Sequence, residues 1–185
     1  MKYHTLLTSN LIKDKESLYQ HVIRHPEVDY FNGPGAIHGG ANSSWTNTDL
    51  ARRLLENYDD IINDCRLQGG LEFVAVRPNL ENHIHIDDLN NANGFARRTL
   101  LMIPLSYRDL IPCDYHDADG NIIESCDASN GYDWLHDTQA PHSLTNGPSL
   151  RLHLEFGFNE DFRTVYGLIA RGTLFRNYKV ILANA

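Results

Sequence analysis

The segment 149–158 alternates between polar and apolar residues without a break. Its polar members are Arg151, His153 and Glu155, and its apolar members are Leu152, Leu154, Phe156 and Phe158. Successive side chains of a β-strand point to opposite faces of a sheet, so this pattern predicts a strand with one apolar face and one polar face. The chain is therefore expected to contain a sheet that is packed on one side and carries functional groups on the other.

Helical periodicity before residue 70 gives way to strand periodicity after it. The predicted helices cover 13–25 and 48–64, and the predicted strands cover 3–8, 71–76, 83–87, 98–105 and 149–158. The segment 32–44 is rich in Gly, Asn and Ser and predicts a loop, and Asp119-Gly120 predicts a hairpin turn within the polar segment 107–131. Helices followed by many strands predict a mainly β fold, a jelly-roll or double-stranded β-helix barrel with helices outside one sheet. No linker divides the chain, so residues 1–185 are expected to form one domain.

Composition narrows the class of partner and the compartment. The formal net charge of -8 argues against nucleic acid, because an acidic chain repels phosphate backbones. Cys65, Cys113 and Cys126 are too few and too widely spaced for a disulfide framework or a zinc ribbon, so they predict free thiols. The sequence has no signal-peptide pattern and no membrane-spanning segment, which predicts a soluble, cytoplasmic protein.

The tripeptide His85-Ile86-Asp87 is the first candidate for a metal site. Residues at positions i and i+2 of a strand point to the same side, so His85 and Asp87 can reach one ion, while Ile84 and Ile86 can pack on the other side. His142 is the candidate for a third ligand. Two imidazoles and one carboxylate form the facial triad of non-haem Fe(II) oxygenases, which leaves three coordination positions open.

Arginines near these residues suggest a place for a carboxylate. Arg151 follows His142 by nine residues, with a turn at 146–148 between them, so two neighbouring antiparallel strands would carry both into one cavity. A guanidinium binds a carboxylate through two parallel hydrogen bonds. Arg97 and Arg98 precede the strand that begins near residue 99, and either is a candidate for binding a substrate carboxylate or one end of a cosubstrate. We predict that Arg98 and Arg151 bind the cosubstrate. The alternative for Arg97 and Arg98 is that they lie at a solvated strand end.

The spacing of His85, Asp87, His142 and Arg151 resembles that of the Fe(II)/2-oxoglutarate dioxygenase superfamily. The sequence PHSLTNGPSLRLHLEF resembles the aspartyl/asparaginyl β-hydroxylase and bacterial proline hydroxylase branch. The resemblance extends over residues 71–158. It implies a double-stranded β-helix in which the two histidines and Asp87 bind iron and Arg151 binds the C5 carboxylate of 2-oxoglutarate. Aspartyl β-hydroxylase itself lacks the carboxylate ligand, so the presence of Asp87 favours the small-molecule hydroxylases of this branch.

By this resemblance, the expected reaction is hydroxylation of an unactivated C–H bond, with dioxygen consumed and succinate and CO2 released. The expected substrate is an amino acid, a small peptide or a protein side chain, and ascorbate is expected to help keep the iron as Fe(II). Two alternatives stay open. A cupin-type metalloenzyme would use His83, His85 and His142 without 2-oxoglutarate, and a non-catalytic jelly-roll module would bind no transition metal. The sequence does not specify the substrate or the oligomeric state.

Overall fold

The computed structural model describes residues 3–26, 28, 43–45, 48–58, 70–87, 97–106, 113–126 and 132–183. Within these residues the strands form two antiparallel sheets. The larger sheet has the order β11 (Val180–Ala183), β1 (His4–Ser9), β8 (Asp133–Asp137), β5 (Thr99–Pro104), β10 (Arg151–Phe158), β3 (Leu71–Val76) and β2 (Ser43–Trp45). The smaller sheet has the order β4 (Glu81–His85), β9 (His142–Thr145), β6 (Cys113–His116) and β7 (Ile122–Cys126).

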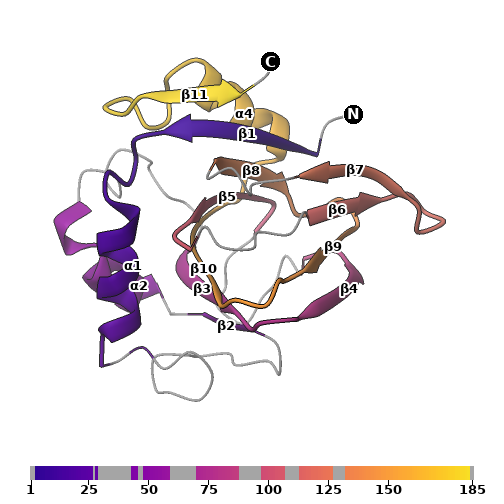
Figure 1. Ribbon diagram of the computed structural model, residues 1–185. Coiled ribbons are helices and arrows are strands. Elements are labelled where there is room, and N and C mark those ends of the chain that lie inside the picture. Colours follow the sequence, from indigo (N-terminus) through magenta and orange to yellow (C-terminus); the bar gives the residue numbers. More distant parts are fainter. Residues whose placement is uncertain are drawn as a thin grey trace.

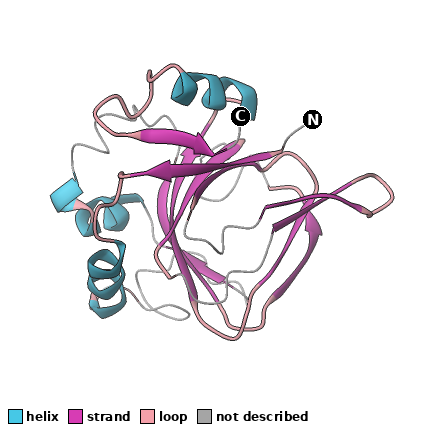
Figure 2. Ribbon diagram, turned by 45° about the horizontal axis from the view of Figure 1, so that its top comes forward, coloured by secondary structure: helices cyan, strands magenta, loops and turns pink. Residues whose placement is uncertain are grey.

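The helices lie outside the larger sheet, and the smaller sheet faces its other side (Figure 1, Figure 2). They are α1 (Lys15–Arg24), α2 (Thr48–Leu54), the 3-10 turn η1 (Glu56–Tyr58) and α4 (Phe162–Ala170). Two antiparallel sheets that enclose an interior, with helices against one of them, are the double-stranded β-helix that the sequence predicts. In the described part of the chain, no helix has the length and apolarity needed to cross a membrane.

The strand β10 confirms the alternation that the sequence shows. Leu152, Leu154 and Phe156 belong to the main apolar core, where side chains of α1, α2 and α4 pack against the outer face of the larger sheet. Arg151 and Glu155 point to the inner face, and both are buried as well. This strand lies in the middle of the sheet, between β5 and β3, and is buried on both faces.

The first helix is well predicted and the second is shorter than predicted. In α1, the Asp14 carboxylate accepts a hydrogen bond from the Ser17 N–H at 2.8 Å, which caps the helix and fixes its start. The second helix, predicted to reach residue 64, ends as an α-helix at Leu54. The N–H of Leu55 donates to the carbonyls of both Ala51 and Arg52, each at 3.1 Å, and such a shared donor tightens the chain into the 3-10 turn η1. Residues 59–64 lie outside the described residues.

The loop and turn predictions have mixed outcomes. The Asp119-Gly120 hairpin is confirmed between β6 and β7, and Gly120 takes the positive φ of 84° that the turn needs. The surrounding segment, predicted to be turn-rich, contributes both of these strands to the smaller sheet. The predicted loop 32–44 lies outside the described residues except for its last two, which begin β2. Ile84 and Ile86, expected to pack, are 47% and 53% exposed.

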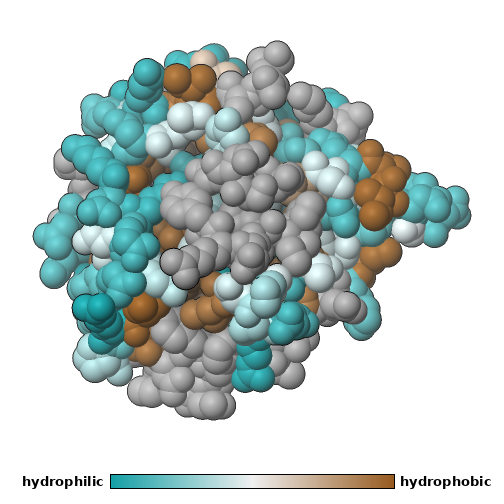
Figure 3. All heavy atoms as spheres, in the orientation of Figure 1, coloured by the Kyte–Doolittle hydropathy of each residue, from teal (hydrophilic) through white to brown (hydrophobic). Residues whose placement is uncertain are grey.

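The outer surface is mostly polar on the side that Figure 3 shows, with apolar side chains beside the β6–β7 hairpin. Two exposed isoleucines, Ile122 and Ile123, lie on β7. The C-terminal region, ambiguous in the sequence, forms α4 and the edge strand β11. The helix ends before Gly172, whose φ of 63° favours glycine.

Candidate metal centre

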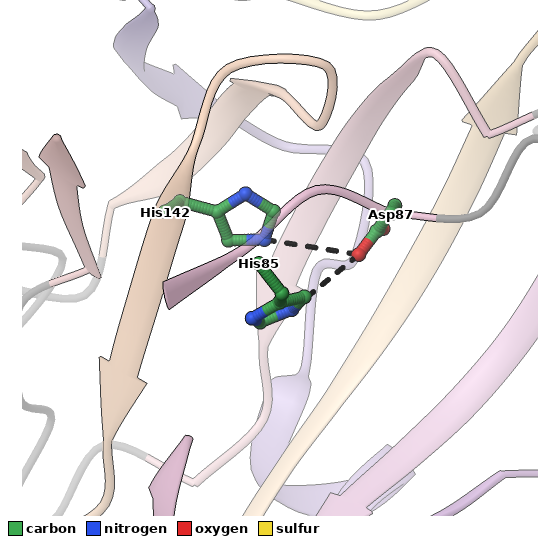
Figure 4. Close-up of side chains that lie close together, drawn as sticks. All are labelled: His85, Asp87 and His142. Atoms are coloured by element: carbon green, nitrogen blue, oxygen red, sulfur yellow. Dashed lines mark ion pairs between the residues drawn. The ribbon is translucent and has the colours of Figure 1, made fainter. Parts of the chain in front are cut away.

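Three side chains, one each from β4, β9 and the segment that follows β4, converge in the wall of the space between the sheets. The residues are His85, Asp87 and His142, here called the metal triad. Each offers one ligand atom, and these three atoms lie within 4.8 Å of one another. The Asp87 Oδ1 atom lies 3.6 Å from the His85 Nε2 atom and 3.7 Å from the His142 Nε2 atom (Figure 4). Three separate donors at these distances can bind one ion without rearrangement of the backbone.

The pairing of β4 with β9 positions the two histidines. His85 ends β4, His142 begins β9, and the two residues are direct partners in the strand register, with ring centroids 4.4 Å apart. Asp87 follows the end of β4, not within the strand as predicted, and its N–H donates to the Thr138 carbonyl at 3.1 Å. This bond fixes the backbone at Asp87 although the strand has ended. His142 is buried and the His85 side chain is 40% exposed, so the triad is open to solvent on one side.

Hydrogen bonds set the protonation of both rings. The Nδ1 atom of His85 lies 2.8 Å from the His83 carbonyl, and that of His142 lies 2.9 Å from the Ala140 carbonyl. A carbonyl only accepts, so each Nδ1 carries a proton and donates it. The neutral ring then has its lone pair on Nε2, the atom that faces Asp87, which is the arrangement of a metal-binding histidine.

The other candidate ligands are not part of this group. His83 is exposed and lies outside the cluster of possible ligands in the described residues, so the cupin-type set with His83 is not brought together. Cys113 lines the adjacent cavity, but burial raises the pKa of its thiol to about 12. A protonated thiol is a poor ligand. Cys113 is a free thiol, as predicted.

A cavity of about 280 Å³ lies between the sheets and includes the metal triad in its wall. Val74, Met102 and Trp134 contribute apolar surface from the larger sheet. The other polar groups of the wall are those of His136, Arg97, His153 and Glu155. An apolar enclosure with a few convergent polar groups is typical of a site for a small molecule.

Arg151 is buried beside this cavity with little to compensate its charge. Only 2% of its surface is exposed, and its Nε and Nη1 atoms have no hydrogen-bond partner within the described residues. Its Cζ atom lies 5.0 Å from the ring centroid of Trp134, which lines the cavity. Burial lowers the pKa of Arg151, although nearby acidic groups, including Glu155, act to raise it. A buried guanidinium with unpaired donors is unfavourable unless an anion joins it.

The predicted pairing of the His142 and Arg151 strands is wrong. The two strands β9 and β10 belong to different sheets and face each other instead of sharing a ladder. The chain crosses at Asn146, whose buried amide donates to the Arg77 carbonyl at 2.6 Å and the Ser149 carbonyl at 3.1 Å. These bonds hold a crossover where the sequence suggested a hairpin turn. His142 lines the cavity, and Arg151, from the opposite sheet, contacts the cavity-lining residue Trp134.

The two arginines before β5 differ in position. The Arg97 side chain lines the cavity and forms an ion pair with Glu155. Arg98 is exposed and does not line the cavity, so the structure does not bring this predicted cosubstrate-binding residue to the site. Both residues precede β5, and the backbone of Arg98 is hydrogen-bonded to that of Phe158 and Thr138, while its side chain is exposed.

Comparisons with known proteins support the fold. No protein-family model and no curated protein sequence matches the chain. A solved 2OG-Fe(II) oxygenase family oxidoreductase from Burkholderia pseudomallei matches with a TM-score of 0.52 and 12% identity, over 80% of this chain and 82% of that one.

This chain has the 2OG-Fe(II) oxygenase fold. A prolyl-4-hydroxylase from Pseudomonas putida matches with a TM-score of 0.49 and 14% identity, over 85% of this chain and 94% of that one. HygX from Streptomyces hygroscopicus, solved with nickel and 2-oxoglutarate bound, matches with a TM-score of 0.47 and 15% identity, over 82% of this chain and 80% of that one.

Two polar residues near the metal triad, His136 and Tyr115, were not identified from the sequence. The His136 ring meets the His142 ring edge-on at a centroid distance of 4.6 Å, and its Nδ1 atom lies 2.5 Å from the Tyr115 hydroxyl. Burial raises the pKa of Tyr115 and lowers that of His136, so the hydroxyl donates to a neutral ring. The ring proton is then on Nε2. The alternation of β8, with Trp134 and His136 facing inward, was the signal that could have identified His136.

Proposed function

We propose that this protein is an Fe(II)/2-oxoglutarate-dependent oxygenase that hydroxylates an unactivated C–H bond. The observation that carries the proposal is the metal triad of His85, Asp87 and His142, in which the Nε2 atoms of the two histidines lie 3.6 and 3.7 Å from one Asp87 oxygen. Two imidazoles and a carboxylate on one side of an ion are the ligand set of non-haem Fe(II) oxygenases. The double-stranded β-helix around the triad supports the same class.

The triad residues would hold Fe(II) on one side and leave the opposite positions open toward the cavity. When bound, the iron activates dioxygen for oxidation of the substrate, with decarboxylation of 2-oxoglutarate to succinate. The protein contributes fixed ligands: the backbone carbonyls of His83 and Ala140 orient the two rings. Around them, apolar side chains such as Met102 and Leu144 limit the entry of water.

Arg151 is the proposed anchor for the C5 carboxylate of 2-oxoglutarate. Its unpartnered Nε and Nη1 atoms are buried donors, and a carboxylate would satisfy them. The Trp134 ring beside the guanidinium restricts where it can move, and the Trp134 Nε1–H is a further buried donor without a partner within the described residues. Together they would form a site for an anion next to the cavity, on the side where Trp134 lines it.

Other parts of the proposal follow from the sequence. We take residues 1–185 as one catalytic domain and expect a small-molecule or peptide substrate and no nucleic acid. Dioxygen is the oxidant, and ascorbate would restore iron that is lost to Fe(III) during turnover without substrate.

The test is succinate formation from 2-oxoglutarate under air with Fe(II) and ascorbate. We expect slow substrate-independent turnover by the wild type and a rate lower by at least about 100-fold in Asp87→Ala, since loss of one ligand weakens iron binding. His21→Ala, a change in an exposed histidine of α1, is the matched control and should keep the wild-type rate. Equal rates in the wild type and Asp87→Ala would contradict the assigned triad, and the absence of any turnover with 2-oxoglutarate bound to the loaded protein would contradict oxygenase activity.

A further inference from the structure

The wall of the cavity next to the metal triad contains a second polar group, formed by His153, Glu155 and Arg97. The Glu155 Oε1 atom accepts from the His153 Nε2–H at 2.8 Å, and its Oε2 atom accepts from an Arg97 Nη2–H. All three residues line the cavity. Burial alone would raise the pKa of Glu155, but Arg97 and His153 lower it to about 2, so the carboxylate is ionised. Both of its oxygens are occupied by neighbours within this wall.

Arg97 is held at both ends and still has donors to offer. Its carbonyl accepts from the Thr138 hydroxyl, and the following N–H, of Arg98, donates to the Phe158 carbonyl at 3.1 Å. A guanidinium has five N–H donors, and in the described part of the chain Glu155 uses one of them. The Arg97 side chain is 20% exposed and lines the cavity, so a molecule bound in the cavity can reach its remaining donors. A guanidinium fixed in this way is preorganised to bind a carboxylate.

The position of Arg97 relates it to the metal triad. Burial disfavours its charge, but the carboxylates of Glu155, Asp87 and Glu72 outweigh this and raise the pKa of Arg97. Arg97 and Asp87 line the same cavity. A molecule bound to Arg97 would lie beside the metal triad. Arg151, by contrast, is at the start of β10, four residues from Glu155.

His153 contributes an acceptor to the same wall. Burial lowers the pKa of His153, so the ring is neutral and donates its proton from Nε2 to Glu155. The other ring nitrogen, Nδ1, is then an acceptor, and it has no partner within the described residues. A buried acceptor of this kind is costly unless a ligand completes it. An N–H group bound near Arg97 would do so.

We propose that this wall is the substrate subsite, in which Arg97, positioned by Glu155, binds the carboxylate of a free α-amino acid and His153 accepts from its amine. The inference rests on the proposed oxygenase function and narrows its substrate class. Arg97 and Glu155 already neutralise each other, so a zwitterion adds no net charge to the cavity, whereas a bare carboxylate would. The cavity size fits a small molecule beside the cosubstrate.

The experiment measures binding to the protein loaded with Zn(II) and 2-oxoglutarate, by ligand-observed NMR. The probes are the twenty proteinogenic L-amino acids and the C-terminal amide of each. At least one amino acid should bind, and its amide, which lacks the anionic carboxylate, should bind at least about tenfold more weakly. Because this comparison uses the wild type alone, it does not depend on the folding of a variant.

The variants then locate the carboxylate. Arg97→Gln should weaken binding of the amino acid at least about tenfold and abolish its advantage over the amide, and Arg97→Lys should recover part of the affinity because a cation is kept. Arg98→Gln removes the exposed neighbouring arginine and should bind as the wild type does.

The contradicting results separate the two proposals. If the loaded wild type binds 2-oxoglutarate but binds no amino acid, or binds the amide equally well, the subsite is wrong and the oxygenase proposal survives. A loss of affinity for 2-oxoglutarate in Arg97→Gln, with the amino acid unaffected, would make Arg97 a cosubstrate residue and also overturn the subsite. If the wild type fails to bind 2-oxoglutarate with any divalent metal, the oxygenase proposal fails and the subsite fails with it.

Discussion

The two faces of β10 differ in kind although they belong to the same strand. On the outer face, Leu154 and Phe156 are fully buried in the apolar core formed with the helices. On the inner face, Arg151 and Glu155 are almost as deeply buried, at 2% and 5% exposure, although both carry ionisable groups. Burial alone therefore does not separate residues that stabilise the fold from residues that serve the site. The distinction is whether the buried group is satisfied by its neighbours within the chain.

The inner face itself contains both situations. Glu155 has a partner for each oxygen, whereas Arg151 has unpartnered Nε and Nη1 atoms within the described residues. We infer that Glu155 is a structural and positioning group already complete in the free protein, and that Arg151 is completed only by a ligand. Substitutions of these two inner-face residues should therefore change the stability of the ligand-free protein in opposite directions.

The largest expected effect is on the outer face. Leu154→Ala removes a fully buried side chain from the centre of the main core and should lower the free energy of unfolding by about 3 kcal/mol, from lost burial and the cavity that remains. Denaturant unfolding of the metal-free protein measures this. A change below about 1 kcal/mol would mean that the core relaxes around the cavity, and the contrast between the faces would lose its basis.

Glu155→Gln should lower stability by a smaller amount, about 2 kcal/mol, because it leaves the Arg97 cation without a counter-ion in a largely buried wall. The same unfolding measurement applies, with Glu160→Gln as a control at the following loop. Unchanged stability in Glu155→Gln would show that Arg97 turns to solvent and that the wall is not fixed by the ion pair.

The pH dependence of stability provides a separate test of Glu155. Its pKa in the folded protein, about 2, lies below the usual value of 4.5, so its ionisation stabilises the folded state above about pH 4.5 and this contribution is lost as the pH falls toward 2. The stability difference between the wild type and Glu155→Gln should therefore shrink between pH 5 and pH 3. A difference that stays constant over this range would contradict the low pKa.

Arg151→Met should have the opposite sign. Replacing an incompletely paired, buried cation with an apolar chain of similar length should raise the stability of the ligand-free protein by about 1 kcal/mol, offset in part by the lost contact with Trp134. Added 2-oxoglutarate and metal should raise the melting temperature of the wild type and not that of the variant. A clearly destabilised Arg151→Met would indicate that the guanidinium is already satisfied in the free protein.

The smallest expected effect is that of Arg98→Gln. This arginine is exposed and outside the cavity, so the free energy of unfolding should change by less than about 0.5 kcal/mol. Denaturant unfolding of Arg98→Gln and Arg97→Gln, measured side by side, checks this. An equal loss of unfolding free energy in both variants would contradict the distinction between the two arginines.

The sequence predicted the parts of the molecule that depend on local periodicity. The alternation of 149–158 predicted β10 and its two faces, and Asp119-Gly120 predicted the β6–β7 hairpin. It predicted the metal triad from the i, i+2 spacing and from a family resemblance, and the structure brings those three residues together. What failed was long-range: the crossover at Asn146, which places β9 and β10 in different sheets, depends on bonds to residues some 70 positions earlier in the chain. The choice of Arg98 over Arg97 as the cosubstrate-binding arginine also failed, because the sequence does not define to one residue which of two neighbours turns inward before β5.

The most direct test of the central claim is calorimetric titration of 2-oxoglutarate into the oxygen-free protein, with and without Mn(II) in place of Fe(II). We expect binding that requires the metal, and an affinity about 10- to 100-fold lower in Arg151→Gln but unchanged in Arg163→Gln, an exposed arginine of α4. This result would show that one ligand extends from the metal triad to Arg151. Metal-independent binding, or equal affinity in the wild type and Arg151→Gln, would contradict the account.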